Sequence, residues 1–419
     1  MPGINMLTLE DFNYNGKRVL LRVDINSPVD IKTGLITNET RIKKSIPTIE
    51  YLSDSGARLV IIAHQGDTED YNKLISLREH SEKLQALLDR PVGFIDDVAG
   101  PAAREKIISV KSGEILLLDN LRYLCEEVST FERDVKLTAA QMTGCYLVKN
   151  LAPLFDYYVN DAFAAAHRNS PSMTAFQELL PSAAGKLLIN EINALSSIIV
   201  EPERPCVFLL GGLRVADAFG MMRETLSSKT ADYILTGGVT GQIMLMAGGI
   251  NLGAPSVRFI KDRSLDRFVK DAKEYLTNYP DKLLVPDDLA VDENGIRKEI
   301  ATGDLPSDSL IVDIGEGTVK RYKKIIEKAL TIFVNGPPGI YENDISSMGT
   351  KAMWGAVADA PGFSVIGGGD TISSASKFID TEKIDYICTA GGALIRFLSG
   401  VKLPLIEAMK QSYLRYKKD

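Results

Sequence analysis

The sequence predicts an α/β protein built from two doubly wound, parallel-sheet domains. Short apolar runs alternate with helical stretches along most of its 419 residues, and this alternation is typical of parallel sheets with helices on both faces. Several runs are continuously apolar, as expected of strands buried on both faces. The length suggests roughly two domains. Ligands of such sheets bind beyond the carboxyl ends of the strands, so the residues that follow each run are the candidates for a site.

Composition and charge narrow the class of protein. Apolar residues make up 45% and charged residues 25% of the chain, which is ordinary for a globular protein. The net charge of −7 does not favour non-specific binding to nucleic acid. No apolar run approaches the roughly 20 residues that span a bilayer, and no signal peptide is evident. The four cysteines form no CxxC pair and there are three histidines, so we expect no zinc cluster and a cytoplasmic location.

In the first half, the apolar runs end in charged and amide side chains. The runs cover residues 18–23, 57–63, 114–118 and 157–159. The polar residues at or beyond their carboxyl ends are Asp24, Asn26, His64, Arg122, Asp161, His167 and Arg168. Arg41 lies between the first two runs, before a helical stretch. Singly, each is more readily a helix cap or a solvated charge. Together on one sheet edge they indicate an anion pocket, because the arginine fork matches phosphate and carboxylate.

A predicted helix joins the two halves. Leu179–Ser182 would open it, apolar residues from Leu188 to Ile199 recur at helical spacing, and two prolines in Glu201–Pro205 close it. We therefore expect an N-terminal domain over 1–180, an interdomain helix over 181–200 and a C-terminal domain over 201–394.

In the second half, the apolar runs end in glycine. One glycine pair is common in turns, but five runs with glycine at the same presumed edge indicate a crevice where backbone approaches a flat or phosphorylated ligand. These glycines are Gly211, Gly212, Gly237, Gly238, Gly336, Gly339, Gly367, Gly368, Gly369, Gly391 and Gly392. Neither a Walker A motif nor GxGxxG is present, so a nucleotide would be held by other means. Residues 251–330 are less informative; 283–288 indicates a further strand and 318–330 a basic amphipathic helix.

The stretch 363–378 has two interpretations. Its three glycines, followed by Asp370, Thr371 and a helical segment, could bind phosphate through backbone N–H groups and the positive end of the helix. Asp370 could then hold magnesium. Alternatively, this is a tight strand-to-helix turn with Asp370 as its N-cap. The other glycine-ended runs and the charged edge of the first half favour the nucleotide site.

Two pockets of different chemistry suggest transfer between two bound ligands. Phosphoryl transfer asks a protein mainly for alignment, magnesium and positive groups around the moving phosphoryl. The chain offers Arg41, Arg214 and Asp370 for this, with backbone N–H groups at 367–371 and 390–393.

Five motifs carry a resemblance to a known family. They are Arg18-Val-Leu-Leu-Arg-Val-Asp-Ile-Asn26, Tyr158-Val-Asn-Asp-Ala-Phe163 with His167-Arg168, Asn335-Gly-Pro337, Gly367-Gly-Gly-Asp-Thr371 and Thr389-Ala-Gly-Gly-Ala393. In their order and spacing the chain resembles phosphoglycerate kinase over essentially its full length, in a divergent, archaeal-type branch.

The resemblance implies a fold and a reaction. Two Rossmann-like domains would be joined by a hinge helix, and residues 395–419 would return to the N-terminal domain. The enzyme would transfer a phosphoryl group reversibly from 1,3-bisphosphoglycerate to ADP, giving 3-phosphoglycerate and ATP, with Mg²⁺. It would work in glycolysis and gluconeogenesis on small molecules, without nucleic-acid or membrane partners, and we expect a monomer.

The resemblance also implies roles by position. The 3-phosphoglycerate site would comprise Asp24, Asn26, Arg41, His64, Arg122, His167 and Arg168. Arg41 and Arg214 would stabilise charge on the transferring phosphoryl, and Gly391 and Gly392 would mark the helix end that faces it. The nucleotide site would comprise Gly211, Gly212, Gly237, Gly238, Asn335, Glu342, Gly367, Gly368, Gly369, Asp370 and Thr371, with Asp370 as the metal ligand.

The chain departs from the family pattern at four positions. Asp67 stands where the family usually has an arginine, Arg214 and Ala218 stand where it has lysines, and Ala390 replaces a glycine. We expect these changes to affect rate and substrate affinity more than reaction type.

Two other functions are considered. A non-catalytic protein that binds a nucleotide or phosphometabolite on the same scaffold would be favoured by joint loss of Arg41, Asp370 and the glycine loops, but all are present. A different acyl-phosphate kinase on a similar fold is disfavoured by the 3-phosphoglycerate-type residues of the first half.

Overall fold

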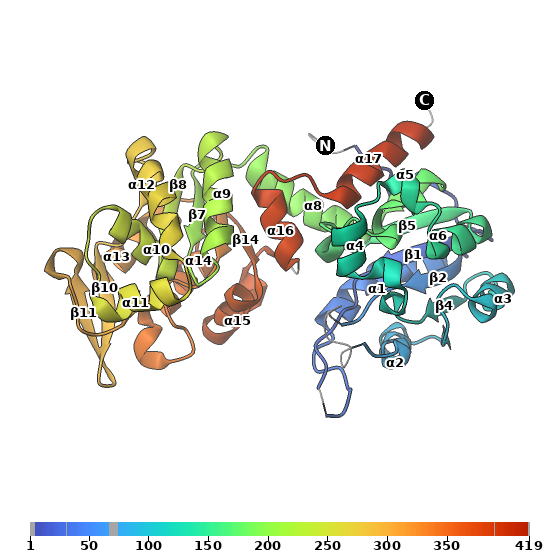
Figure 1. Ribbon diagram of the computed structural model, residues 1–419, viewed down its shortest axis with the longest axis horizontal. Helices are drawn as coiled ribbons and strands as arrows, with labels where there is room; N and C mark the ends of the chain where they lie inside the picture. The colour runs from blue at the N-terminus through green and yellow to red at the C-terminus, as the bar shows by residue number, and fades with distance from the viewer. Residues whose placement is uncertain (1–4, 31, 67–73, 389, 418–419) are drawn as a thin grey trace. The chain divides into compact units, whose positions relative to one another are not determined.

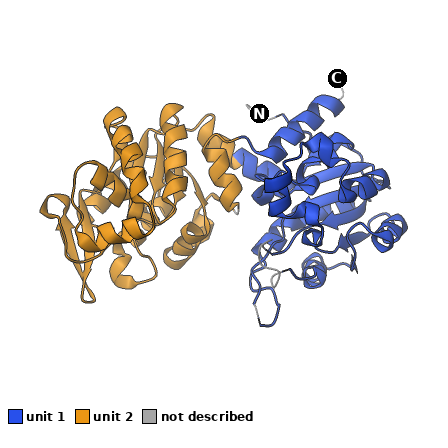
Figure 2. Ribbon diagram, in the orientation of Figure 1, with its two compact units in different colours: residues 1–193, 402–419 blue, residues 194–401 orange. Residues whose placement is uncertain are grey.

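The computed structural model describes residues 5–30, 32–66, 74–388 and 390–417, and it divides into two compact units (Figure 2). Unit 1 comprises Met1–Asn193 and Lys402–Asp419, and unit 2 comprises Ala194–Val401. The division therefore falls inside the helix that the sequence suggested as a separate segment over 181–200. Each unit is described by itself below.

Unit 1 is built on a six-stranded sheet in the order β3-β4-β2-β1-β5-β6, in which every neighbouring pair is parallel (Figure 1). Its strands are β1 (Arg18–Val23), β2 (Arg58–Ile62), β3 (Val92–Ile95), β4 (Ile115–Leu118), β5 (Tyr157–Asp161) and β6 (Ser182–Ala184). The central strands are almost wholly buried, which explains why their sequences are continuous apolar runs. The predicted parallel sheet is confirmed, and β3 and β6 are strands that the sequence analysis missed.

Helices cover both faces of this sheet, because successive side chains of a strand point to opposite sides. Val19 and Leu21 of β1 belong to one core with helices α1 and α2, while Leu20 belongs to another with α3 and α6. The helices of unit 1 are α1 (Thr40–Asp54), α2 (Arg78–Leu88), α3 (Pro101–Ser109), α4 (Ser129–Val135), α5 (Ala139–Met142), α6 (Tyr146–Leu151), α7 (Pro171–Thr174) and α17 (Pro404–Tyr416). The protein has the doubly wound arrangement predicted for it.

The predicted helix start at 179–182 is wrong. Ser182–Ala184 forms β6 on the edge of the sheet beside β5, and helix α8 (Lys186–Ile199) begins only after it. The cap of α8 is not local, because Leu188 N donates to Oδ1 of Asp161, 2.9 Å away, at the end of β5. A cap supplied by another strand leaves no local signature in the sequence.

Unit 2 is built on a second six-stranded parallel sheet, in the order β15-β14-β13-β7-β8-β9. Its strands are β7 (Cys206–Leu210), β8 (Tyr233–Thr236), β9 (Leu283–Leu284), β13 (Thr331–Asn335), β14 (Phe363–Gly367) and β15 (Tyr386–Cys388). Since all are parallel, the five glycine-ended runs share one carboxyl edge, as predicted.

The helices of unit 2 also pack on this sheet. Tyr322 of α13 and Trp354 of α14 share a core with Val207 and Val334 of the sheet, and α10 packs against β8. The helices are α9 (Val215–Ser227), α10 (Gly238–Ala247), α11 (Ala254–Asp262), α12 (Val269–Asn278), α13 (Glu316–Ile326), α14 (Met348–Ala358), α15 (Gly369–Phe378) and α16 (Gly391–Leu398). The basic helix expected over 318–330 is α13, which ends four residues earlier.

A three-stranded antiparallel sheet in unit 2 was missed. Strands β10 (Asp288–Glu293) and β11 (Ile296–Ala301) form a hairpin, and β12 (Ile311–Ile314) pairs with the other side of β10. The turn is Asn294-Gly295, with φ angles of 55° and 85°. An Asn-Gly pair in which both residues have positive φ is the typical two-residue hairpin turn, so the sequence did contain the signal.

The C-terminal segment returns to unit 1, as predicted, but later than residue 395. Helix α16 belongs to unit 2, and the chain passes to unit 1 at Lys402. In α17, Arg415 donates from Nη1 to the carbonyl of Gln177 at 3.0 Å and from Nη2 to Oε2 of Glu178 at 2.7 Å. The last helix thus closes the N-terminal core.

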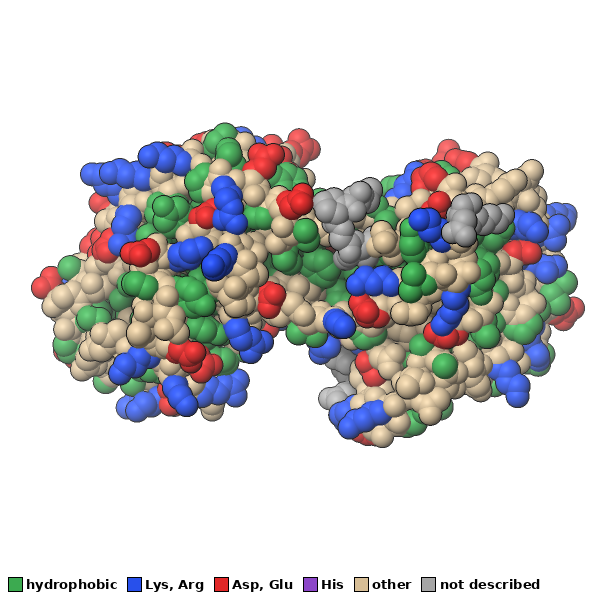
Figure 3. All heavy atoms as spheres, turned by 90° about the horizontal axis from the view of Figure 1, so that it is seen from above, with side chains coloured by type: hydrophobic (Ala, Val, Ile, Leu, Met, Phe, Trp, Pro, Cys, Tyr) green, Lys and Arg blue, Asp and Glu red, His purple; other side chains and the backbone are tan. Residues whose placement is uncertain are grey.

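Charged side chains of both signs are interspersed on the face seen in Figure 3. Among the described residues, no helix has both the length and the apolar character needed to cross a membrane.

Candidate functional site

The carboxyl edge of unit 1 gathers the charged residues that the sequence singled out. Strands β4, β2, β1 and β5 are neighbours and parallel, so the segments after them meet at one edge. His64, after β2, is buried there within the electrostatic reach of four arginines. These are Arg22, Arg122, Arg168 and Arg41. The edge therefore gathers four guanidinium groups around one histidine.

His64 is held as a neutral hydrogen-bond donor. Arg22 Nη2 lies 2.8 Å from His64 Nδ1, and because arginine can only donate, Nδ1 must accept. The proton of the neutral ring is then on Nε2. Burial first, and then the surrounding arginines, hold the pKa of His64 well below its ordinary value. The neutral ring thus has one N–H left to donate to a ligand.

A buried network below this edge orients Arg22, and the sequence analysis did not identify it. Arg22 Nε donates to Ser172 Oγ at 3.3 Å, and Ser172 Oγ donates to Glu127 Oε2 at 2.7 Å. Burial raises the pKa of Glu127, while the hydrogen bonds from Ser172 and the charge of Arg22 lower it. The available signal was an arginine inside an apolar strand, since a charge that is buried on a strand needs partners.

The other predicted residues of this edge differ in their contacts. Arg41, at the start of α1, pairs through Nη1 with both oxygens of Asp24, at 3.1 and 3.2 Å. Arg168 pairs through Nε with Glu132 at 2.6 Å, and its buried Nη2 has no hydrogen-bond partner in the described part of the chain. An unpartnered buried guanidinium N–H is suited to an anionic ligand.

Further residues shape the loops of this edge. Asn26 accepts a hydrogen bond from Gly66 N at 3.1 Å, which joins the segments after β1 and β2. Arg122 Nη1 donates to the carbonyl of Glu127 at 3.0 Å. His167 is half-buried. Asp161 is not part of the cluster, because it caps α8.

The buried histidines predict how stability depends on pH. An unfolded histidine has a pKa of about 6.5, whereas His64 stays well below that value and burial lowers the pKa of His80 to about 4. Below about pH 6.5 each of these two histidines therefore binds more protons in the unfolded chain than in the native chain, so its contribution to the free energy of unfolding falls as pH falls. Each histidine contributes up to about 1.4 kcal/mol per pH unit.

We expect His64→Gln to lessen this dependence between about pH 6 and 5, because glutamine offers an acceptor to Arg22 but does not titrate. Urea unfolding at several pH values measures it, and His80→Gln is the matched control that should remove a similar slope. An unchanged slope in both variants would contradict the neutral, buried state of these rings.

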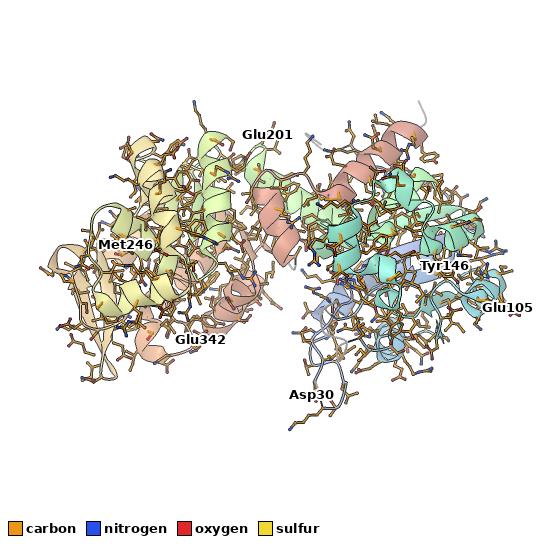
Figure 4. The ribbon with its side chains drawn as sticks, in the orientation of Figure 1. Asp30, Glu105, Tyr146, Glu201, Met246 and Glu342 are labelled. Atoms are coloured by element: carbon orange, nitrogen blue, oxygen red, sulfur yellow. The ribbon has the colours of Figure 1, made fainter. Side chains whose placement is uncertain are left out.

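In unit 2, a cavity of about 390 Å³ opens beside the glycine-rich edge. Its predicted lining residues are Gly212, Gly238, Glu342 and Asp370. Apolar side chains complete it, among them Leu213, Val239, Phe259, Ile311 and Ile340. A largely apolar cleft with a few polar groups is typical of a small-molecule site and suits a nucleotide base and ribose. Glu342 is labelled in Figure 4 and comes from the segment that follows β13.

Several glycines allow backbone segments of this edge to approach one another. A Cβ on Gly211 would lie 2.6 Å from the carbonyl oxygen of Pro337, and one on Gly237 would lie 2.7 Å from Cβ of Pro338. Gly212 N and Gly238 N donate to the carbonyls of Pro337 and Pro338. These glycines therefore bring the loops after β7, β8 and β13 together, and their N–H groups are engaged within the protein.

Asn335 and Thr371 hold the neighbouring loops. Asn335 Nδ2 donates to the carbonyl of Gly367 at 2.7 Å, and Gly336 N donates to Thr371 Oγ1 at 2.8 Å. Both side chains are buried. A Cβ on Gly367 would lie 2.0 Å from Leu394. These residues join the segments that follow β13 and β14, and none of them lines the cavity.

Asp370 lies in the first turn of α15, whose N-cap is Gly368 with a φ of 100°. It is therefore not the N-cap. Its carboxylate lines the cavity near the positive end of the helix. In the described part of the chain, no group of three or more His, Cys, Asp or Glu side chains is placed to hold a metal. One carboxylate fits magnesium bound jointly with nucleotide phosphates and water, since Mg²⁺ rarely uses an all-protein cage.

The remaining predicted residues lie outside this cavity lining. Arg214 is the N-cap residue of α9, with a side chain 73% exposed and Nη1 3.9 Å from Asp217 Oδ2. Gly391 and Gly392 form the first turn of α16 after Ala390. Ala218 is fully buried in α9. Gly369 lies beside Asp370 in α15. Asp67 and Thr389 are outside the described residues.

These two edges, an arginine and histidine cluster in one α/β unit and a nucleotide-sized cleft in the other, define a two-domain α/β enzyme of the phosphotransferase class. A family model described as phosphoglycerate kinase matches residues 9–401. The chain belongs to the phosphoglycerate kinase family.

Relatives with this name are similar over nearly the whole chain. The phosphoglycerate kinase of Methanothermus fervidus is 41% identical over 411 residues, which cover 98% of each chain. That of Pyrococcus horikoshii is 41% identical over 421 residues, covering 98% of this chain and 99% of the relative. The predicted resemblance to an archaeal-type branch is confirmed by such relatives.

Solved structures of phosphoglycerate kinases are similar to this chain over nearly its whole length. The crystal structure of phosphoglycerate kinase from Pyrococcus horikoshii OT3 has a TM-score of 0.86 at 39% identity, covering 98% of this chain and 100% of that one. The enzyme from Coxiella burnetii has a TM-score of 0.83 at 30% identity, covering 97% and 99%. The predicted two-domain fold is therefore confirmed, and the comparisons favour the kinase over the non-catalytic alternative.

Proposed function

We propose that the chain catalyses the reversible transfer of a phosphoryl group from 1,3-bisphosphoglycerate to ADP, giving 3-phosphoglycerate and ATP. The bond between the carboxyl oxygen and phosphorus breaks, and a bond between phosphorus and an oxygen of the ADP β-phosphate forms. The observation that carries this proposal is the occurrence of the arginine and histidine cluster and the nucleotide-sized cavity in one chain of this family.

In this proposal the carboxyl edge of unit 1 binds 3-phosphoglycerate. His64 donates from Nε2, and Arg122 and Arg168 bind phosphate or carboxylate oxygens. Asp24 orients Arg41, because both carboxylate oxygens accept from Arg41 Nη1. The Arg41 guanidinium stabilises the negative charge of the moving phosphoryl group, which is the main contribution a protein makes to such a transfer.

The cavity of unit 2 binds the nucleotide. Its apolar walls take the base, Glu342 accepts from the ribose hydroxyls, and Asp370 would hold magnesium together with the phosphates. Bound there, magnesium would supply positive charge that offsets the negative charge of the phosphates. The first turn of α16, at Gly391 and Gly392, offers N–H groups that the helix leaves unused to the transferring group.

The decisive experiment is a coupled assay with ATP and 3-phosphoglycerate, run with and without magnesium. We expect turnover that needs all three components. A rate indistinguishable from buffer would refute the proposed function. The same protein should also lack turnover with other carboxylic acids, because the charged edge of unit 1 would then bind only part of its ligand.

Arg214 provides a further prediction. It follows Leu213 of the cavity lining, and the buried Ala218 cannot supply the second cation that the family places there. We therefore expect Arg214→Ala to lower kcat by about 100-fold, since it removes a charge that acts on the phosphoryl group. Arg214→Lys should retain activity.

The matched control for this prediction is Arg223→Ala, which removes an exposed arginine from the same helix and should leave kcat unchanged. Full activity of Arg214→Ala would show that another cation has this role.

We propose that the enzyme acts in the cytoplasm, in glycolysis and gluconeogenesis, as a monomer.

A further inference from the structure

One arginine connects the antiparallel hairpin of unit 2 to the wall of the nucleotide cavity. Arg297, on β11, has a side chain only 11% exposed. Its Nη1 donates to Asp313 Oδ2 at 3.0 Å and to the carbonyl of Ile345 at 3.1 Å. Its Nη2 donates to the carbonyl of Ile314 at 2.9 Å, and its Nε donates to Glu299 at 2.8 Å. A guanidinium used by all three of its nitrogens is firmly fixed.

The segment that receives this contact lines the cavity. Between β13 and α14, it contributes Pro337, Gly339, Ile340, Tyr341 and Glu342 to the lining. The hydrogen bond from Arg297 to Ile345 therefore restrains the same segment that is proposed to bind the ribose and base.

Asp313 lies against this segment and also binds the helix that follows it. A Cβ on Gly339 would lie only 2.1 Å from Asp313 Oδ1, so the chain passes directly over this carboxylate. Gly349 N, in the first turn of α14, donates to Asp313 Oδ2 at 2.6 Å. Ile340 N adds a hydrogen bond of 2.8 Å to the carbonyl of Val312. The side chain of Asp313 is fully buried, and its cation is Arg297.

A second cation holds the middle of the segment from another element. Lys377, on α15, donates from Nζ to the carbonyls of Tyr341 at 2.9 Å and Glu342 at 3.2 Å. The same helix carries Asp370 in its first turn. The segment between β13 and α14 is therefore bonded to α15, which carries Asp370, and to the β10–β11 hairpin.

We propose that Arg297 is a positioning residue for the nucleotide. By joining the β10–β11 hairpin to Asp313 and to the carbonyl of Ile345, it holds Tyr341 and Glu342 in the place where they receive the ribose and base of a nucleoside diphosphate or triphosphate. This inference rests on the proposed function of the cavity. Arg297 itself does not line the cavity.

The consequence for kinetics follows from preorganisation. Without Arg297 the segment must be ordered when the nucleotide binds, and this cost lowers affinity. The transfer step takes place at the phosphate end, beside Asp370, so turnover at saturating nucleotide should not change. Burial raises the pKa of Asp313 to about 6 and Arg297 opposes this, so removing Arg297 alone also leaves a buried carboxylate without its cation.

The test compares Arg297→Met with Lys298→Met as matched control. Lys298 lies next to Arg297 on the same strand, and its exposed ammonium pairs with Glu293 on the same hairpin, at 2.9 Å. We expect Arg297→Met to raise the KM for ATP about tenfold, with kcat and the KM for 3-phosphoglycerate within about twofold of wild type. Lys298→Met should match wild type, and Arg297→Lys should lie between, because lysine keeps the charge without the fork.

The double variant Arg297→Met/Asp313→Asn separates positioning from folding. It removes the buried charge but does not restore the hydrogen bond to Ile345, so it should fold and still show the raised KM for ATP. An unchanged KM for ATP in the folded double variant would overturn the inference. So would a lower kcat accompanied by equal rises in the KM for ATP and the KM for 3-phosphoglycerate. Absence of turnover in the wild type would instead refute the proposed function, so the two failures are distinct.

Discussion

Replacing Arg41 with alanine is expected to lower kcat by about 100-fold or more while changing the KM for ATP little. Arg41 belongs to unit 1, and it is oriented by Asp24 through Nη1 with its side chain one-third exposed. A guanidinium in this position offers its other N–H groups to a ligand. Its charge matters most when the phosphoryl group has left one oxygen and is not yet bonded to the other, because an interaction made only in the transition state affects kcat.

Steady-state kinetics with each substrate varied in turn measures this effect. Lys43→Ala is the matched control, since Lys43 lies on the same helix and pairs on the surface with Glu39 at 3.6 Å. It should behave like wild type, because an exposed ion pair contributes little. If Arg41→Ala raised only the KM for ATP, Arg41 would belong to the nucleotide pocket and its proposed role would be wrong.

Replacing Asp370 with asparagine is expected to lower turnover at ordinary magnesium concentration by about 100-fold. Asparagine keeps the shape and one oxygen but loses the charge that a hard cation prefers. Asp370 is the carboxylate at the start of α15 among the cavity residues, and the described chain offers no cluster of ligands that could replace it. The loss should be partly restored as the magnesium concentration rises.

A magnesium titration of activity checks this prediction, with Glu342→Gln as the control. Glu342 is the other carboxylate of the cavity lining, and its replacement should raise the KM for ATP without changing the magnesium requirement. Equal magnesium dependence in Asp370→Asn and the wild type would show that Asp370 does not hold the metal. Calorimetric titration of magnesium and ADP gives a second measurement that does not depend on turnover.

Much of the fold was accessible from the sequence because its cause is local. The run 18–23 coincides with β1, and the run 114–118 contains β4. A strand buried on both faces must be continuously apolar, and it must end where polar residues or glycine begin. The hairpin at Asn294-Gly295 was equally local and was overlooked.

The errors have a tertiary cause. The start of α8 depends on Asp161, which lies in another strand, so Pro181 and Ser182 misled the prediction. Strand β6 has only three residues and exists because β5 offers it an edge. No property of Ser182–Ala184 alone marks it as a strand.

The site shows the same division. The sequence by itself determined which side chains share an edge, because parallel strands bring their carboxyl ends together, and it determined the family through motifs in order. The tertiary structure alone decided what each of them does there. It placed Arg22 and Glu127 in a buried network below the edge, it assigned the His64 proton to Nε2, and it used the N–H groups of Gly212 and Gly238 within the protein. These outcomes depend on hydrogen-bond partners far apart in the chain, whose burial and direction only the folded protein fixes.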